Sequence, residues 1–206
     1  KRFESLKENL AKRIANELGE EIYKYLGGGA FGVAYSTKSG KVIKLTSDKS
    51  EFLLAYRLVK NKKWMKCLIN FYNVGKIFEK SQIKDPYIYY ILMDQVLPLS
   101  DIEKLAISSY YSVMNSDNHY EKLNDLESII EKIPIRGMGL QIREKVRELY
   151  PYVRNISTEL KKHKIGGTDF HSGNVGWDKT KQNLVLFDIS TMNEDGKITS
   201  RFLLKN

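Results

Sequence analysis

Three polar residues near the C-terminus, Asp169, Asn174 and Asp188, have the types and the spacing to do chemistry. Asn174 lies five residues after Asp169, and Asp188 directly follows the apolar run 184–187. Phosphoryl transfer from a magnesium nucleotide uses a carboxylate that orients the attacking hydroxyl, an amide that ligates the metal, and a second carboxylate that bridges metal and phosphate. The pattern therefore indicates a candidate site for Mg²⁺ and phosphate groups.

A cluster of glycines near the N-terminus could supply the other half of such a site. Gly27, Gly29 and Gly32 form the pattern G-x-G-x-x-G, Gly28 lies within it, and Lys44 follows twelve residues after the last glycine. Glycines let a backbone lie close over phosphates, and a lysine reaches phosphate oxygens as a point charge. The glycine pattern alone is weak, because dinucleotide-binding folds also contain it.

The residues that follow the glycines separate these two kinds of site. In a dinucleotide-binding fold the third glycine opens a helix. Here the β-prone runs 33–35 and 42–45 flank the turn sequence 38–40. The sequence therefore predicts a glycine bend between two strands and places Lys44 inside a third strand.

With these motifs in this order, the chain resembles the protein-kinase-like superfamily from about residue 20 to about residue 190. The resemblance implies that Lys44 pairs with an acidic residue of the next helix, predicted over 50–60, and Glu51 is the candidate. Glu51 lies only seven residues after Lys44, closer than in the usual protein kinases. The resemblance also implies that Lys44 and the glycines bind the phosphates of ATP.

The same resemblance assigns residues to adenine binding and to the metal. The run 89–96 resembles the strand and hinge that receive adenine, with Met93 as gatekeeper and the backbone of Asp94 and Val96 bonding the base. Asn174 and Asp188 would hold Mg²⁺. The implied cofactors are therefore ATP and Mg²⁺.

The catalytic loop departs from the protein-kinase form. The sequence 168–174 contains D-x-H-x-x-N, which is closer to aminoglycoside phosphotransferases and other atypical kinases, with Asp169 as the catalytic carboxylate. Asp188-Ile189-Ser190 replaces Asp-Phe-Gly, and sixteen residues follow Ser190. We therefore expect a reduced C-lobe without the usual activation segment.

The expected fold class is α+β: a bilobal protein-kinase-like fold with a five-stranded N-lobe sheet, one N-lobe helix and a truncated, mostly helical C-lobe. The predicted domains are an N-terminal helix over 1–19, the N-lobe and hinge over 20–96, and the C-lobe over 97–206. A capping box, Ser100-x-x-Glu103, predicts the first C-lobe helix, over 100–114. The remaining predicted strands are three in 20–46 and one each in 70–78, 87–96, 175–177 and 184–187; the remaining helices are 4–18, 117 or 118 to about 133, and 151–164.

Composition limits the other possibilities. The 206 residues include 34 Lys and Arg against 25 Asp and Glu, which gives a net charge of +9. No apolar run approaches the ~20 residues that span a bilayer, and the single cysteine, Cys67, excludes an internal disulfide. We expect a cytoplasmic protein with no membrane partner and a buried Cys67. The basic stretch 132–164 is either a solvated helix pair or a surface for an acidic protein or nucleic acid.

Three functions remain open from the sequence. The first is an ATP- and Mg²⁺-dependent kinase that phosphorylates protein Ser/Thr hydroxyls or itself, with a small-molecule acceptor as the alternative. The second is a pseudokinase that serves as a nucleotide-binding interaction module. The third is a basic binding domain with no nucleotide site, in which each polar residue has an ordinary structural role.

Overall fold

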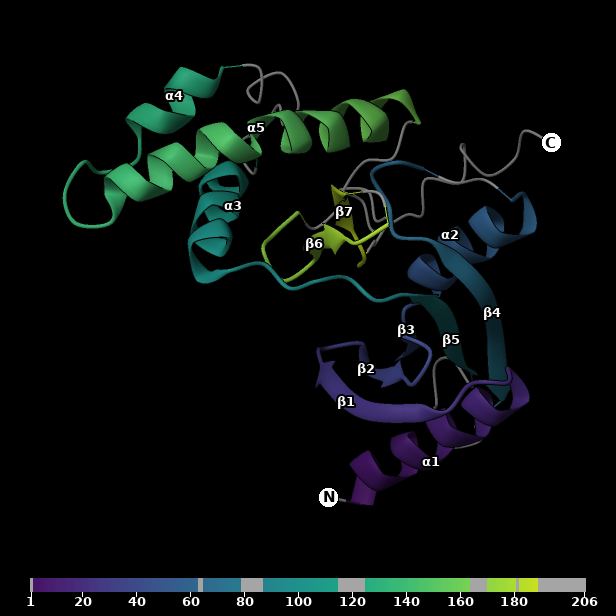
Figure 1. Cartoon of the computed structure of the whole chain (residues 1–206). Coiled ribbons are helices and arrows are strands. Elements are labelled where there is room, and N and C mark those ends of the chain that lie inside the picture. Colours follow the sequence, from purple (N-terminus) through teal and green to yellow (C-terminus); the bar gives the residue numbers. More distant parts are fainter. Residues whose placement is uncertain are drawn as a thin grey trace. The chain divides into compact units, whose positions relative to one another are not determined.

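The computed structural model describes residues 2–62, 65–78, 87–114, 125–163, 170–180 and 182–188 (Figure 1). The chain divides into two compact units. The sheet unit consists of Lys1–Trp64 and Asn70–Gln95, and the helical unit consists of Met65–Ile69 and Val96–Asn206. The three domains expected from the sequence stay a prediction.

The sheet unit is built on a five-stranded sheet in which all neighbouring strands are antiparallel, in the order β1-β2-β3-β5-β4. A five-stranded sheet was predicted, and the mixed α/β architecture is confirmed. The strands are β1 (Ile22–Gly28), β2 (Gly32–Thr37), β3 (Lys41–Thr46), β4 (Phe71–Phe78) and β5 (Tyr87–Asp94).

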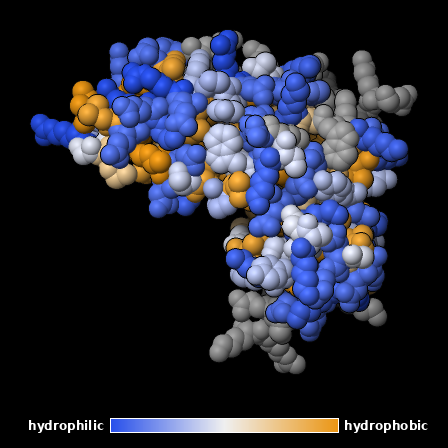
Figure 2. All heavy atoms as spheres, viewed as in Figure 1, coloured by the Kyte–Doolittle hydropathy of each residue, from blue (hydrophilic) through white to orange (hydrophobic). Residues whose placement is uncertain are grey.

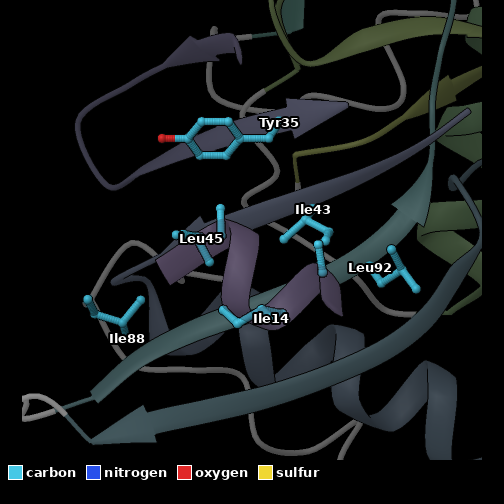
Figure 3. Packing of buried hydrophobic residues seen from close by; sticks show 8 residues of the cluster. Ile14, Tyr35, Ile43, Leu45, Ile88 and Leu92 are labelled. Carbon is cyan, nitrogen blue, oxygen red and sulfur yellow. The ribbon is translucent and has the colours of Figure 1, made fainter. Parts of the chain in front are cut away.

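Helix α1 (Arg2–Glu17) covers one face of this sheet. Its buried residues Ala11, Ile14 and Ala15 form a cluster with side chains of β2, β3 and β5 (Figure 3). Ile43 and Leu45 of β3 belong to this cluster. Because side chains alternate along a strand, Lys44 between them points to the opposite face.

Helix α2 (Lys49–Lys60) packs against β4 and β5. Asp48 caps its N-terminus, since the Asp48 Oδ1 atom accepts a hydrogen bond from the Ser50 N–H at 2.8 Å. Phe52 of α2 stacks on Tyr89 of β5 with ring centroids 4.5 Å apart. Asp48 lies two residues after the end of β3, so α2 begins at Lys49 and Glu51 lies in its first turn.

The helical unit contains α3 (Asp101–Met114), α4 (Leu126–Glu131), α5 (Gly139–Lys162) and a hairpin of β6 (Val175–Asp178) and β7 (Asn183–Leu186). The predicted capping box is confirmed. The Ser100 N–H donates to a Glu103 carboxylate oxygen at 2.7 Å, and the Glu103 N–H donates to the Ser100 hydroxyl at 3.4 Å.

Glu103 also links α3 to the hairpin, because it accepts a hydrogen bond from the Trp177 indole N–H at 3.1 Å. Burial would raise the pKa of Glu103, but the hydrogen bonds from Ser100 and Trp177 outweigh it and hold the pKa below its usual value. The stability that this carboxylate adds is present at neutral pH and is lost as the pH falls through the folded-state pKa.

Helix α5 corrects two predictions for the stretch 132–164. The expected helix pair is one 24-residue helix that begins at Gly139, and Pro151 lies inside it instead of opening a helix. Proline lacks an N–H, so one main-chain hydrogen bond is lost. The helix continues because its buried side chains hold both halves on the core: Val146, Leu149, Val153, Ile156 and Leu160.

The prediction for α4 is partly outside the described residues, since the expected start at 117 or 118 falls there. Within them, Asp125 caps a short helix, and its Oδ1 atom accepts a hydrogen bond from the Ser128 N–H at 3.0 Å. Three apolar side chains are exposed in the connection from α4 to α5 and in the first turn of α5, a region where Figure 2 shows apolar surface at the left. These residues are Ile135, Met138 and Leu140.

The short segment Met65–Ile69 joins the hairpin of the helical unit. Leu68 forms a parallel bridge with Leu186, the Ile69 N–H donates to the Leu186 carbonyl at 3.0 Å, and the Leu186 N–H donates to the Cys67 carbonyl at 2.9 Å. The Cys67 side chain is fully buried, as predicted. Of the helices that the structure describes, none is long and apolar enough to cross a membrane.

Candidate functional site

The glycines form the bend between β1 and β2. Gly27 and Gly28 of β1 pair with Ala34 and Val33 of β2, and the Gly29 N–H donates to the Gly32 carbonyl at 2.9 Å. At Gly32 a Cβ atom would lie 2.3 Å from the Leu45 carbonyl oxygen of β3, so no other residue fits there without moving the backbone. The predicted glycine bend between two strands is confirmed.

The tip of this glycine loop is held by a residue that sequence reasoning missed. The Phe31 carbonyl accepts hydrogen bonds from the Ser47 N–H at 2.8 Å and from the Ser47 hydroxyl at 3.0 Å. The Phe31 side chain itself is 67% exposed. Ser47 therefore anchors the tip through the main chain of Phe31, and no sequence pattern signals such a contact.

Lys44 and Glu51 lie together, as the resemblance implies. The Lys44 Nζ atom is 2.6 Å from the Glu51 Oε1 atom, and the two side chains are only 13% and 5% exposed. Their short separation in sequence suffices because the Asp48 cap starts α2 so soon after β3. Lys44 also pairs in the sheet with Ala34 of β2, the strand that leaves the glycine loop.

The end of β5 is fixed by a hydrogen-bond network around Asp94. Its two carboxylate oxygens accept bonds from the Asn70 amide and the Tyr72 hydroxyl, each at 2.8 Å, and its N–H donates to the Asn70 carbonyl at 3.1 Å. Met93 is buried before it and pairs with Val42 of β3. Val96, the third residue expected at the adenine, belongs to the helical unit.

In the helical unit, Asn174 is positioned by main-chain hydrogen bonds. Its N–H donates to the His171 carbonyl at 2.9 Å, and its carbonyl accepts from the Phe187 N–H at 3.0 Å. Asp188 follows Phe187 directly, so this bond brings the backbones of the two expected metal ligands side by side. Asn174 is buried and Asp188 is half-buried.

The turn before Asn174 is compact. The Gly173 N–H donates to the His171 Nδ1 atom at 2.9 Å, so this nitrogen is an acceptor in the turn. A Cβ atom on Gly173 would lie 2.7 Å from the His171 ring, so a larger residue there would have to displace the ring from this turn. Asp169, the expected catalytic carboxylate, lies outside the described residues.

Two comparisons with known proteins found no relative: no protein-family model and no curated protein matches the sequence. Solved structures do resemble the chain. One is the kinase PK-1 of Cydia pomonella granulovirus, with 16% identity and a TM-score of 0.42 over 85% of this chain and 55% of that chain. Another is a mutant of the PknI kinase domain of Mycobacterium tuberculosis, with 13% identity and a TM-score of 0.41 over 85% of this chain and 61% of that chain.

Both neighbours are named as kinases. This chain spans less than two thirds of the length of either one. The likeness of the loop around Asp169 to aminoglycoside phosphotransferases stays a prediction. The function proposed for this chain rests on its own residues and contacts.

Proposed function

We propose that this protein is an ATP- and Mg²⁺-dependent phosphotransferase with a bilobal protein-kinase-like fold, in which the sheet unit is the N-lobe and the helical unit belongs to the C-lobe. The observation that carries the proposal is the ion pair of Lys44 and Glu51. Taking two charges out of water costs free energy that their attraction often fails to repay, so a buried pair is weak support for stability. A functional reason for keeping this pair is therefore favoured.

The sheet unit would bind the nucleotide phosphates. The bend at Gly27, Gly28, Gly29 and Gly32 brings backbone close to a ligand, and the neighbouring strand carries Lys44. Glu51 orients the Lys44 ammonium, which is compact and suits phosphate oxygens. The Lys44 ammonium is thus positioned before the reaction, and it stabilises the negative charge that develops on the transferring phosphoryl group.

The helical unit would hold the metal through Asn174 and Asp188. An amide oxygen and a carboxylate fit Mg²⁺, which takes oxygen ligands and usually binds one or two carboxylates together with water and substrate phosphates. The hydrogen bond from the Phe187 N–H to the Asn174 carbonyl supports this assignment, because it sets the two residues side by side. When bound, the ion neutralises phosphate charge.

The remaining roles complete the proposal. Asp169 orients or accepts the proton of the acceptor hydroxyl, and the adenine lies against Met93 and the backbone of Asp94 and Val96. The acceptor is a protein Ser/Thr hydroxyl or this protein itself.

A melting experiment with Mg-ATP tests the proposal. A ligand that binds only the folded state, at 100 times its dissociation constant, adds about 2.7 kcal/mol to the free energy of unfolding. We expect a clear rise in melting temperature with Mg-ATP and a smaller rise with ATP plus a chelator. Protein that circular dichroism shows to be folded, yet that millimolar Mg-ATP does not stabilise, would overturn nucleotide binding.

Transfer of labelled γ-phosphate then separates an enzyme from a pseudokinase. We expect label on a host-lysate protein or on the chain itself. Stabilisation by Mg-ATP without any transfer would instead support the interaction module, for which the Asp188-Ile189-Ser190 triplet is the sequence feature.

A further inference from the structure

The tip of the glycine loop has an anchor that its sequence does not reveal. The Phe31 carbonyl receives two hydrogen bonds from one residue, Ser47: one from the N–H at 2.8 Å and one from the hydroxyl at 3.0 Å. The Phe31 side chain is 67% exposed, and Ala30 beside it is exposed as well. Burial of side chains therefore does little to fix the tip of the loop. Apart from the pairing of β1 with β2, the bonds from Ser47 to the Phe31 carbonyl restrain its position.

The turn that contains Ser47 also begins α2. The Thr46 hydroxyl accepts a bond from the Asp48 N–H at 3.0 Å, and the Asp48 carboxylate accepts bonds from the Ser50 N–H at 2.8 Å and the Glu51 N–H at 3.4 Å. Glu51 in turn pairs with Lys44. A continuous series of bonded groups thus connects the loop tip to the ammonium of Lys44.

We propose that Ser47 is a positioning residue that clamps the tip of the glycine loop to the start of α2. The clamp sets the backbone of the loop and the ammonium of Lys44 from one short turn, so both are in place before a nucleotide arrives. This inference rests on the proposed function, because the loop matters to catalysis only if it covers phosphates. The Ser47 hydroxyl supplies one of the two clamping bonds and can be removed without touching the backbone.

Three variants of the full chain test the clamp. Ser47→Ala removes the hydroxyl bond and keeps the N–H bond, while Ser47→Thr keeps both donors. Ser108→Ala is the matched control, since the Ser108 hydroxyl is also exposed and donates to a main-chain carbonyl, that of Lys104, at 2.8 Å.

The first measurement is amide hydrogen exchange of residues 27–34 without nucleotide. One lost hydrogen bond of ordinary strength corresponds to roughly a threefold to tenfold change in an equilibrium. We expect exchange in this stretch to rise by about that factor in Ser47→Ala, and to stay at the wild-type rate in Ser47→Thr and Ser108→Ala. Unchanged exchange in Ser47→Ala would overturn the clamp.

The second measurement is the KM for ATP against kcat in phosphoryl transfer. A loosened loop should raise KM by roughly threefold to tenfold in Ser47→Ala, while kcat changes less than about twofold, and Ser47→Thr should restore KM. Faster exchange with an unchanged KM would overturn the link between clamp and nucleotide. A wild-type chain that binds no Mg-ATP would overturn the proposed function, whereas the exchange result would still decide the clamp.

Discussion

Lys44 in the sheet unit is bonded by another side chain, whereas Asn174 in the helical unit is bonded through the main chain. A second side chain, Glu51, bonds the Lys44 ammonium at 2.6 Å. Asn174 is instead fixed by main-chain bonds to His171 and Phe187, at 2.9 and 3.0 Å. Substitution of Glu51 therefore removes a bond to the Lys44 ammonium, whereas substitutions of the side chains around Asn174 leave its main-chain bonds available.

This difference predicts how each unit responds to mutation. In the sheet unit, function should depend on individual partners such as Glu51 and Ser47. In the helical unit, it should depend on the ligand atoms themselves and on the shape of the turn at Gly173, where a Cβ atom would press on His171.

The largest expected effect is a loss of turnover on substitution of Asp169 or Asp188, and the two variants should differ in their affinity for Mg-ATP. Asp169→Asn should lower turnover by about 10²–10⁴-fold, because a general base contributes that much, and leave Mg-ATP affinity nearly unchanged. Asp188→Asn should weaken Mg²⁺-dependent binding of ATP as well as turnover. Calorimetry and transfer assays on both variants measure this; equal losses of affinity would contradict the two roles.

Lys44→Met should lower turnover by about 10²–10³-fold, since it removes a charge that stabilises the transition state. The substitution also leaves the negative charge of the buried Glu51 carboxylate without the Lys44 cation beside it, which destabilises the fold. The double variant Lys44→Met, Glu51→Gln removes this charge and should melt closer to the wild type while staying inactive. Lys38→Met is the control, because the Lys38–Glu21 pair is exposed on both sides. Near-normal transfer by Lys44→Met would show that Lys44 does not act on the transferring phosphate.

Glu51→Gln should have a smaller effect, a loss of about tenfold in turnover, because it loosens Lys44 without deleting it. Glu21→Gln makes the same chemical change in the exposed pair with Lys38 and should be silent. Steady-state kinetics on the two variants give the comparison directly. If both were silent, Lys44 would not depend on a side-chain partner, and the contrast between the units would disappear.

The smallest effect concerns the scaffold of the helical unit. The fully buried Tyr110 of α3 donates its hydroxyl proton to the Val146 carbonyl of α5, and burial raises the pKa of this hydroxyl. Tyr110→Phe should lower the free energy of unfolding by about 1 kcal/mol. In a chain of this size the melting temperature then falls by about 2–4 °C. Tyr23→Phe, at a side chain that is 69% exposed, should not change it; a similar shift in both would argue against this bond.

Much of the sheet unit could be predicted because local patterns agree there. The β-prone runs 33–35 and 42–45, the glycine bend and the turn at Gly40 together predict strands joined by tight connections, and the structure has them. Glu51 was named because the resemblance to kinases implies an acidic partner for Lys44 in the next helix, and the early start of α2 brings its first turn back to β3. The Ser100–Glu103 capping box was equally local and is formed.

The rest depends on contacts that local patterns do not encode. A proline usually lies at the start or the end of a helix. Pro151 lies inside α5, where buried apolar side chains on both sides of it keep the helix continuous. The bond from Ser47 to Phe31 joins residues sixteen positions apart through a carbonyl, which any residue type offers. Met65–Ile69 lies between elements of the sheet unit in sequence, and only its pairing with β7 assigns it to the helical unit.

That short segment has a consequence for synthesis on the ribosome. The Lys66 carbonyl accepts a hydrogen bond from the Asn183 amide, 117 residues further along the chain. At roughly 5–20 residues per second, the partner emerges on the order of ten seconds later. Until then the apolar residues Cys67, Leu68 and Ile69, which end fully buried, have no β7 to pack against. The pairing of this segment is thus completed only after residue 183 has been synthesised, and a ribosome that stalls before it leaves the segment open to chaperones or to aggregation.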